Sequence, residues 1–175
     1  MSQSAPREIL STSRLVLRAT VSADVAPLHE RIFSDPEVSR FVFSGRQFTA
    51  SETANFVRER FNFAGVEVGL STLEERGSGE VVGFAGLIAC SALGREDLEL
   101  GFVLARHAWG KGYATEIGRA QIALGFDRLR RTRLLALVDP ANAPSMNVLA
   151  KLGMRNVTDV TLEGRGGRMV YCIES

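Results

Sequence analysis

The sequence predicts a single domain of the α/β or α+β class, with one mixed central sheet of about seven strands and helices on both faces. The chain has 175 residues, 45% of them hydrophobic and 23% charged, which is enough for one globular domain with its own core. Short apolar runs alternate with stretches of helical periodicity along almost the whole length. Residues 1–175 are therefore expected to form one domain, with residues 1–12 as a flexible N-terminus.

The first part of the chain is predicted to be a strand followed by helices. Residues 14–19 place apolar side chains on one side, as a half-buried strand does. Helical spacing of apolar residues predicts a helix over 22–35, with Ser22 as its N-cap. A short helix over 36–42 is expected next, because Pro36 suits a first helical turn.

A third helix and a hairpin follow. Thr49 and Glu52 have the spacing of a capping box ahead of a helix. Strand patterns occupy 66–74 and 81–89, and the glycines of the segment 77–79 are typical of a turn. These two strands are therefore expected to pair as a hairpin.

The second half of the chain alternates strands with helices and ends in another hairpin. Gly153 is expected to act as the C-cap of the last helix. The predicted elements are a strand from 98, a helix over 112–129, a strand over 133–139, a helix from Pro144 or Ser145 to Leu152, and strands over 155–162 and 169–174.

Residues 98–115, LELGFVLARHAWGKGYAT, carry the clearest chemical pattern. They read as a strand, a tight turn at Gly110 and Gly112, and the start of a helix. Glycines let the backbone approach a ligand closely, and the first N–H groups of a helix carry a partial positive charge. The sequence therefore predicts an anion site at this turn, most plausibly for a phosphate.

Composition argues against several other functions. With 21 basic and 20 acidic residues the formal charge is +1, so neither a nucleic-acid partner nor a membrane partner is expected. Cys90 and Cys172 lie among apolar neighbours and are expected to be buried, reduced thiols. With only His29 and His107 besides, no metal site is predicted. The N-terminus lacks the apolar region of a signal peptide, which favours the cytoplasm.

Five segments, in a fixed order, resemble one known family. They are SRLVLRAT at 13–20, SDPEVSRFV at 34–42, GEVVGFAGL at 79–87, LELGFVLARHAWGKGYATE at 98–116 and NAPSMNVLAKLGM at 142–154. These segments resemble the GNAT superfamily of acetyl-CoA-dependent N-acetyltransferases, and specifically its RimJ/RimL-like branch. The resemblance implies a GNAT-like fold, acetyl-CoA as cosubstrate and a primary amine as acceptor.

The resemblance also implies where acetyl-CoA binds. The family holds the pyrophosphate in a turn of the pattern Gln/Arg-x-x-Gly-x-Gly/Ala, which corresponds here to residues 107–112, with His107 as a departure from the usual first residue. Asn142 and Ser145 correspond to positions that contact the pantetheine end, although Asn142 is also explained as an Asx-turn residue and Ser145 as a helix N-cap. The implied cosubstrate-binding residues are Phe102, Val103, Leu104, His107, Trp109, Gly110, Lys111, Gly112, Tyr113, Ala114, Thr115, Asn142, Ser145, Asn147 and Lys151.

The resemblance suggests Glu99 as the general base. A partly desolvated carboxylate in an apolar strand would have a raised pKa, which favours proton acceptance; the alternative is a solvated Glu at a strand edge. The oxyanion is expected at a main-chain N–H near Val103, where the family's strand bulges and stops pairing with its neighbour. Many relatives protonate the thiolate with a Tyr, but this chain has Leu149 at that place, and Ser145 is the expected substitute.

The acceptor is the least defined part of the hypothesis. Arg46, Phe43, Phe48 and Arg165 are candidates to line its site, although scattered Arg and Phe residues are more often surface charge and core. The expected acceptor is an N-terminal amine of a protein or peptide, or a small amine. A non-catalytic acyl-CoA-binding module for sensing or assembly remains the alternative, and the sequence leaves a homodimer open.

Overall fold

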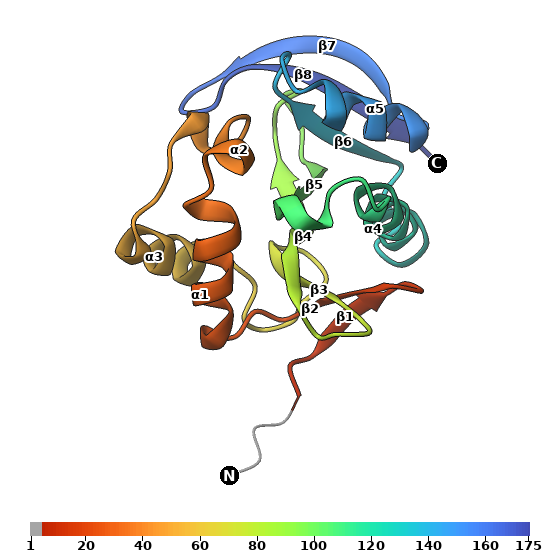
Figure 1. The fold of residues 1–175 in the computed structure, drawn as a ribbon. Helices are drawn as coiled ribbons and strands as arrows, with labels where there is room; N and C mark the ends of the chain where they lie inside the picture. Colours follow the sequence, from red (N-terminus) through yellow and green to blue (C-terminus); the bar gives the residue numbers. More distant parts are fainter. Residues whose placement is uncertain (1–4) are drawn as a thin grey trace.

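One mixed sheet runs through the computed structural model, which describes residues 5–175 (Figure 1). Its eight strands lie in the order β1-β2-β3-β4-β5-β6-β8-β7. Every neighbouring pair is antiparallel except β5 and β6, which are parallel. The strands are β1 (Glu8–Ser11), β2 (Leu15–Arg18), β3 (Ser71–Glu75), β4 (Val81–Cys90), β5 (Asp97–Leu104), β6 (Arg133–Val138), β7 (Arg155–Leu162) and β8 (Gly166–Glu174).

Helices cover both faces of this sheet. Figure 1 shows α1 to α3 on one side and α4 and α5 on the other. The helices are α1 (Val25–Leu28), α2 (Pro36–Ser39), α3 (Ala50–Arg60), α4 (Tyr113–Ala123) and α5 (Ala143–Lys151). The predicted fold class, a mixed sheet with helices on both faces, is confirmed, with eight strands instead of about seven.

The additional strand, β1, lies in the segment that was expected to be flexible. Leu10 pairs with Leu17 and Ser11 with Val16 of β2. Ile9 is buried and joins the core beneath the sheet. The two apolar residues of this strand, Ile9 and Leu10, are adjacent and show no alternation, so the sequence did not indicate a strand. The expectation of a flexible 1–12 segment is wrong for residues 8–11. Residues 1–4 lie outside the described part of the chain.

The helix expected over 22–35 is broken into a 3-10 turn, α1 and a wider π turn over His29–Phe33. Its N-cap is Val21, so the prediction of Ser22 as the cap is wrong. The nearby Asp24 carboxylate is a stronger acceptor than a serine hydroxyl, and it takes the N–H of Val21 (2.9 Å). The next helix, α2, ends at Ser39, three residues before the predicted end.

Strand β3 starts at Ser71, five residues after the predicted start. Gly69 has a φ of +136°, which interrupts the extended backbone before the strand. The side-chain amide of Asn62 donates to the carbonyl of Val66 (2.7 Å) and accepts from its N–H (3.2 Å), so this stretch folds back as a loop. The predicted hairpin of β3 and β4 and the capping box of Thr49 and Glu52 are confirmed.

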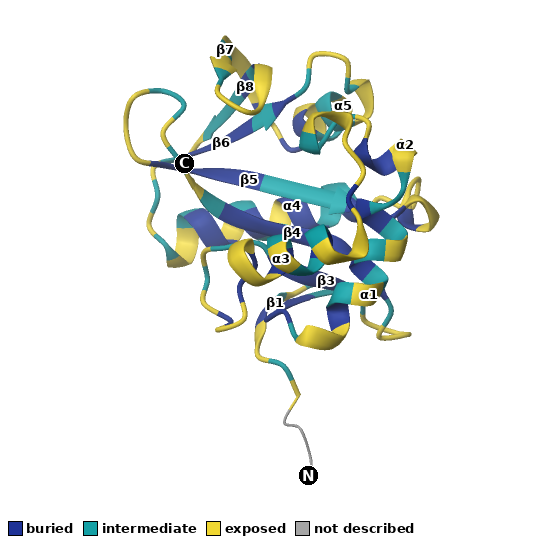
Figure 2. Cartoon of the chain, turned by 90° about the vertical axis from the view of Figure 1, so that its left-hand side faces the viewer, coloured by how far each residue is buried: buried dark blue, intermediate teal, exposed yellow. Residues whose placement is uncertain are grey.

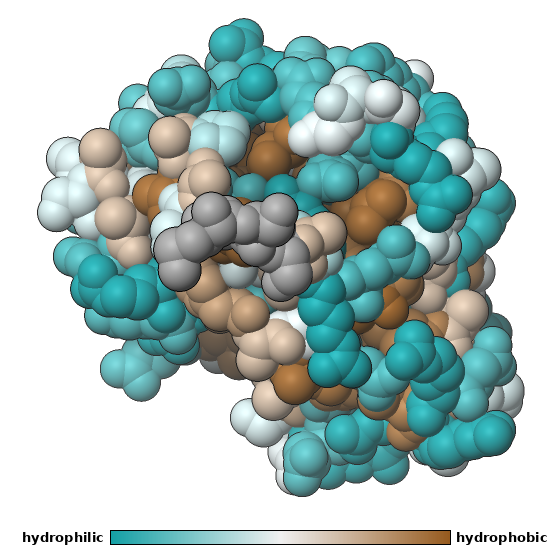
Figure 3. Space-filling model, turned by 90° about the horizontal axis from the view of Figure 1, so that it is seen from below, coloured by the Kyte–Doolittle hydropathy of each residue, from teal (hydrophilic) through white to brown (hydrophobic). Residues whose placement is uncertain are grey.

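Separate apolar cores fill the two sides of the sheet. On the side of α1 to α3 the core is aromatic: the Phe33 ring lies 4.9 Å from Phe43 and 5.8 Å from Phe84. On the other side α4 and α5 pack on leucines and valines of β4 to β6. Seen from below, hydrophilic residues form most of the rim, and apolar residues show in recesses between them (Figure 3).

A buried charge network ties the first helical layer to the sheet. The Arg18 guanidinium donates to both oxygens of Asp24 (2.8 and 2.9 Å) and to Glu74 (2.6 Å). Asp24 is 3% exposed and also accepts the hydroxyl of Thr72 (2.9 Å). Burial opposes ionisation of Asp24, but the hydrogen bonds from Arg18 and Val21 outweigh it and lower its pKa.

Residues 5–175 can be compared with the expectations for membrane spans, metal sites and cysteines. Within that range no helix is long and apolar enough to cross a membrane, and no group of three or more His, Cys, Asp or Glu side chains could hold a metal ion. Cys90 and Cys172 are free and half-buried, not fully buried as expected, and burial raises the pKa of both thiols. The cytoplasmic location stays a prediction from the sequence, as does the possibility of a homodimer.

Gly83 lets β4 approach β5 closely, so we expect Gly83→Ala to destabilise the fold. A Cβ at this position would lie 2.2 Å from the Val103 carbonyl oxygen, and backbone would have to move. The free energy of unfolding should fall by about 2 to 3 kcal/mol in urea titrations. Gly77→Ala is the matched control, because its Cβ would meet nothing within 4 Å and the loss should stay under about 0.5 kcal/mol. Equal losses would contradict the close approach.

Replacing Asp24 by Asn should lower stability at neutral pH by about 3 kcal/mol, because it removes the buried, bidentate carboxylate partner of Arg18 and leaves only Glu74. Since the pKa of Asp24 is lowered by folding, the unfolded chain takes up this proton first. The stabilisation is therefore complete above the unfolded pKa of about 3.9 and is lost as the pH falls through the folded value. Urea titrations from pH 7 to pH 2 should show this loss in the wild type and a flatter curve for Asp24→Asn. Parallel curves would exclude the role of Asp24.

Candidate functional site

The sheet opens between β5 and β6. The two strands share a single residue pair, Glu99 with Leu135. Beyond it they diverge, as Figure 2 shows, and β5 changes from buried residues at 97–100 to half-buried residues at 101–103. A parallel strand that loses its neighbour leaves backbone N–H and C=O groups without partners, so this edge of β5 can bind an extended polar ligand.

The direction of the β5 backbone decides which groups face the opening. The N–H of Ala105 donates to the Val82 carbonyl (2.9 Å), so residues of odd number point their backbone groups toward β4. Phe102 therefore points its N–H and C=O into the opening, one residue before the expected Val103. The register of β4 and β5 runs without a shift, so the opening arises from the loss of β6 and not from a bulge against β4.

The glycine turn and α4 form the second part of the site. Gly110 and Gly112 have φ values of +72° and +80°, a region that favours glycine. Gly112 is the N-cap of α4 and offers no side chain to cap it, and the first backbone bond of the helix is made by Glu116 N–H to the Gly112 carbonyl (3.0 Å). The N–H groups of the first turn, residues 113–115, are thus available to an anion.

The other α-helices that begin after a loop are capped by side chains, whereas α1 continues directly from the 3-10 turn before it. Asp35, Thr49 and Asn142 each accept a backbone N–H at the start of α2, α3 and α5. The uncapped start of α4 is therefore a local departure with a chemical consequence: it provides the donors that a phosphate needs. This donor set fits the pyrophosphate of CoA.

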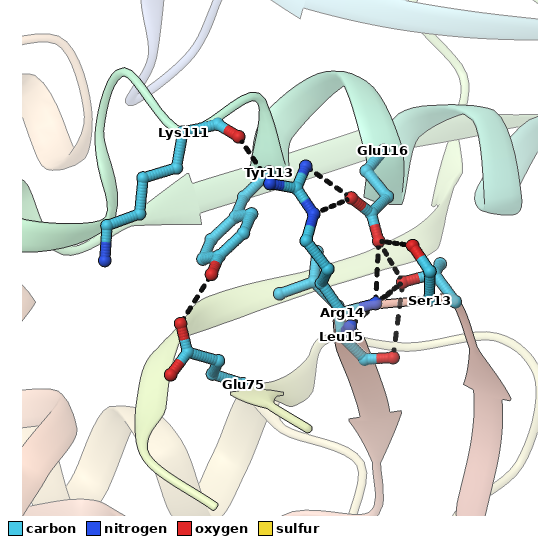
Figure 4. A network of polar contacts seen from close by, with 8 residues as sticks. Ser13, Arg14, Leu15, Glu75, Lys111, Tyr113 and Glu116 are labelled. Atoms are coloured by element: carbon cyan, nitrogen blue, oxygen red, sulfur yellow. Dashed lines mark hydrogen bonds and ion pairs between the residues drawn. The ribbon is translucent and has the colours of Figure 1, made fainter. Parts of the chain in front are cut away.

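Side chains around the turn are mostly engaged with the protein. Tyr113 points into the protein, where its hydroxyl donates to Glu75 (2.5 Å); this bond raises the pKa of Tyr113 and lowers that of Glu75 (Figure 4). His107 Nε2 lies 3.5 Å from a Glu80 oxygen. The indole of Trp109 is 48% exposed, and its N–H donates to the Leu104 carbonyl (2.8 Å). Backbone groups thus dominate what the turn offers a ligand.

Glu99 is held by Arg165. The residue is 5% exposed, and both carboxylate oxygens accept from the guanidinium at 2.9 Å. Arg165 comes from the turn between β7 and β8, 66 residues away in sequence. The hydrogen bonds to Glu99 raise the pKa of Arg165. The sequence suggested Glu99 as a general base and Arg165 as a residue lining the acceptor site. In the structure the two side chains form one bidentate ion pair.

The residues predicted to line the acceptor site lie in different parts of the structure. The Ser44 hydroxyl donates to the Gly164 carbonyl (3.3 Å), so the loop after α2 touches the β7–β8 turn beside Arg165. Phe43 and Phe48 belong to the aromatic core, and Arg46 pairs with Glu52 (2.6 Å). Of the four acceptor candidates, Arg165 is the one in contact with Glu99.

Helix α5 borders the opening from the side of β6. Asn142 is its N-cap, and its side-chain oxygen accepts the N–H of Ser145 (3.2 Å), so the capping role lies with Asn142 and not with Ser145. Ser145 is half-buried, whereas Asn147 and Lys151 are exposed. Leu149, which replaces the tyrosine of many relatives, is 2% exposed and packs into the core between α5 and β6.

The sequence missed one part of the site, a cluster at the edge of the glycine turn. Arg14 contacts both Glu116 and the Lys111 carbonyl (Figure 4). These residues are about 100 positions apart in the chain, and no local pattern connects them. The only available indication was that Arg14 lies in the first of the five segments that resemble the family.

Comparison with known proteins identifies the family. Residues 14–155 match the model of the acetyltransferase (GNAT) domain. The uncharacterized protein YkkB of Bacillus subtilis (strain 168) is 34% identical over 146 residues, 83% of this chain and 84% of its own length. The uncharacterized N-acetyltransferase p20 of Bacillus licheniformis is 31% identical over 152 residues, 85% of this chain and 83% of its own.

Solved structures agree with the sequence relatives. A GNAT-family acetyltransferase from Bacillus anthracis superimposes with a TM-score of 0.79 at 26% identity, covering 94% of this chain and 97% of its own. The shared fold, the matched family model and the donor set at α4 lead to one conclusion. The chain belongs to the GNAT acetyltransferase family and is an N-acetyltransferase that uses acetyl-CoA as its cosubstrate.

Proposed function

We propose that this enzyme acetylates a primary amine of low pKa, namely the α-amine of a protein or peptide N-terminus or a small amine, and that it is of the RimJ/RimL-like type. One observation supports this acceptor class above the others. The only carboxylate expected to act as a base, Glu99, already gives both oxygens to Arg165 at 2.9 Å. With both oxygens engaged by the guanidinium, the carboxylate has no free oxygen to offer an incoming ammonium group, so an acceptor that needs little help to lose its proton is favoured.

The proton requirement separates the acceptor classes. An α-amine has a pKa near 8, so at physiological pH its deprotonation costs about 1 kcal/mol. A lysine or polyamine amine with a pKa near 10.4 costs about 4 to 5 kcal/mol and depends on a base. While Arg165 occupies Glu99, the site therefore favours the first class.

We place the pyrophosphate of acetyl-CoA at the turn of Gly110 and Gly112 and the first turn of α4, and the pantetheine arm along the open edge of β5. The uncapped N–H groups of 113–115 support the first assignment, and the outward backbone of Phe102 supports the second. The flanking residues of the α5 side, Asn142 and Ser145, would border the same arm.

The chemistry is direct transfer. The neutral amine nitrogen attacks the thioester carbonyl carbon, a C–N bond forms, the C–S bond breaks and the thiolate of CoA leaves. The Phe102 N–H is the donor for the charge that develops on the carbonyl oxygen. The proton released by the amine goes to solvent, because Arg165 occupies Glu99. The Ser145 hydroxyl is the expected donor to the thiolate, whose pKa near 8.5 makes the demand small.

The fold itself does not choose the acceptor. A spermidine N-acetyltransferase from Vibrio cholerae in complex with CoA and spermine matches with a TM-score of 0.73 at 17% identity, covering 93% of this chain and 96% of its own. An aminoglycoside acetyltransferase in complex with coenzyme A matches with 0.71 at 20%, covering 91% and 94%. Their named acceptors differ while their fold is shared, so the acceptor of this enzyme has to be inferred from its own side chains.

We expect acetyl transfer to peptide α-amines to exceed transfer to polyamines and aminoglycosides at pH 7.5 by at least about tenfold in kcat/KM, as the difference in amine pKa requires. Thiol release from acetyl-CoA, measured with a panel of N-terminal peptides, spermidine and an aminoglycoside, checks this. A preference for the polyamine at that pH would contradict the acceptor class, and no thiol release across the panel would contradict the proposed function as a whole.

Removing the Arg165 guanidinium from Glu99 should widen the range of amines that the enzyme acetylates. We expect Arg165→Gln to raise kcat/KM for a polyamine by about tenfold or more while leaving α-amines within about threefold, because a general base helps most where the amine pKa is high. Glu99→Gln should abolish that gain in the double variant, and alone it should change turnover of both amine classes little, because Arg165 already occupies the carboxylate in the wild type.

A matched control for Arg165 is Arg95→Gln. Arg95 is an exposed arginine 3.5 Å from the buried carboxylate of Asp97, two residues before Glu99 on the same strand, and Asp97 keeps Arg133 as a partner. Its substitution should change neither acceptor class. A polyamine gain that persists in the double variant would remove Glu99 as the freed base, and an unchanged polyamine rate in Arg165→Gln would remove the blocking role of Arg165.

A further inference from the structure

We propose that Arg14 is a positioning residue of the pyrophosphate turn: it fixes the orientation of the peptide between Lys111 and Gly112, so that the N–H of Gly112 faces the phosphates. This inference rests on the pyrophosphate site proposed above. Arg14 lies in the turn between β1 and β2, at the opposite end of the chain from α4 in sequence but beside its first turn in space (Figure 4).

The Arg14 guanidinium joins two groups of the turn. Nε and Nη2 bind the Glu116 carboxylate at 2.7 and 2.6 Å, and Nη1 donates to the Lys111 carbonyl at 2.9 Å. The guanidinium carbon lies 4.7 Å from the centre of the Tyr113 ring, which supports its flat face. All three nitrogens are thus engaged, and Arg14 acts on the turn through a carbonyl and not as a free phosphate ligand.

The planarity of the peptide transmits this contact. Residues 5–175 contain no cis peptide, and in a trans peptide the C=O and the following N–H point in opposite directions. Because Arg14 draws the Lys111 carbonyl toward β2, the N–H of Gly112 points to the other side. A carbonyl on that other side would repel a phosphate, whereas an N–H attracts it.

Because residue 112 is a glycine, the peptide between Lys111 and Gly112 can adopt either of two orientations. Gly112 has a φ of +80°, and a residue without Cβ allows the preceding peptide to rotate at small steric cost. A Cβ there would lie 3.5 Å from Nη2 of Arg14, which shows how closely the guanidinium follows the turn. The sequence thus leaves the peptide free to flip, and Arg14 selects one of its two orientations.

Glu116 anchors the guanidinium in turn. Its carboxylate also accepts the hydroxyl groups of Thr12 (2.5 Å) and Ser13 (3.2 Å) and the N–H of Arg14 (3.0 Å). Burial opposes its ionisation, but the hydrogen bonds from Thr12 and Arg14 outweigh it and lower the pKa of Glu116. The charged carboxylate holds Arg14 in the position from which it reaches Lys111.

Two acetyl donors test the proposal. With acetyl-CoA, Arg14→Ala should raise KM about tenfold with kcat nearly unchanged, because one aligned amide donor to the phosphate is lost. With S-acetylpantetheine, which has no pyrophosphate, kcat/KM should stay within about twofold of the wild type. In NMR titrations with CoA, the Gly112 amide resonance should shift in the wild type and shift far less in Arg14→Ala.

Arg128→Ala is the matched control, because it removes an exposed ion pair with Glu67 far along the helix from the turn and should change neither donor. Arg14→Lys keeps a donor to the carbonyl without the fork and should give an intermediate KM, which also serves if the alanine variant does not fold. Equal losses with both donors would show a merely structural role and overturn the proposal. An unchanged KM for acetyl-CoA would overturn it as well, and failure of the wild type to bind CoA would overturn the pyrophosphate site itself.

Discussion

The separation of β5 from β6 after one residue pair is the constraint on which the rest of the site depends. It leaves the backbone of Phe102 without a strand partner on that side, whereas β5 pairs with β4 from Asp97 to Leu104 and β6 pairs with β8 from Arg133 to Val138. Such groups are stable only if water or a ligand satisfies them. Helices α4 and α5, packed on the same face, border the opening and bring the glycine turn to one side of it and Ser145 to the other (Figure 1).

Arginine–carboxylate pairs lie at the boundaries of this opening. Arg133 binds both oxygens of Asp97 (2.8 and 2.6 Å) at the end where β5 and β6 still meet, and it lowers the pKa of that carboxyl. Arg165 likewise binds both oxygens of Glu99 at the acceptor end, whereas at the phosphate end Nε and Nη2 of Arg14 both contact one oxygen of Glu116. A planar guanidinium can serve a carboxylate and a carbonyl together, which the point charge of a lysine does less well.

The two pairs have different consequences for function. In the proposed mechanism, the pair with Glu116 prepares the enzyme, because it sets the donor geometry before acetyl-CoA arrives. The pair with Glu99 restricts it, because it occupies a base that high-pKa amines would need. Family membership explains neither property, since relatives of the same fold carry names of different acceptors. In the proposed mechanism the acceptor class therefore depends on the β7–β8 turn, which brings Arg165 to β5.

The sequence by itself determined the fold class, the hairpins and the glycine turn before α4, because strand alternation, caps and glycines act over a few neighbouring residues. The cosubstrate followed from the resemblance of five segments to a known family. It missed β1, whose two apolar residues are adjacent and do not alternate, and it assigned a cap to Ser22 that Asp24 prevents. Only the tertiary structure decided that Glu99 meets Arg165 and that Arg14 meets Lys111. Those contacts join residues 66 and 97 positions apart, and such a contact depends on how strands and turns are arranged in space, which no local pattern contains.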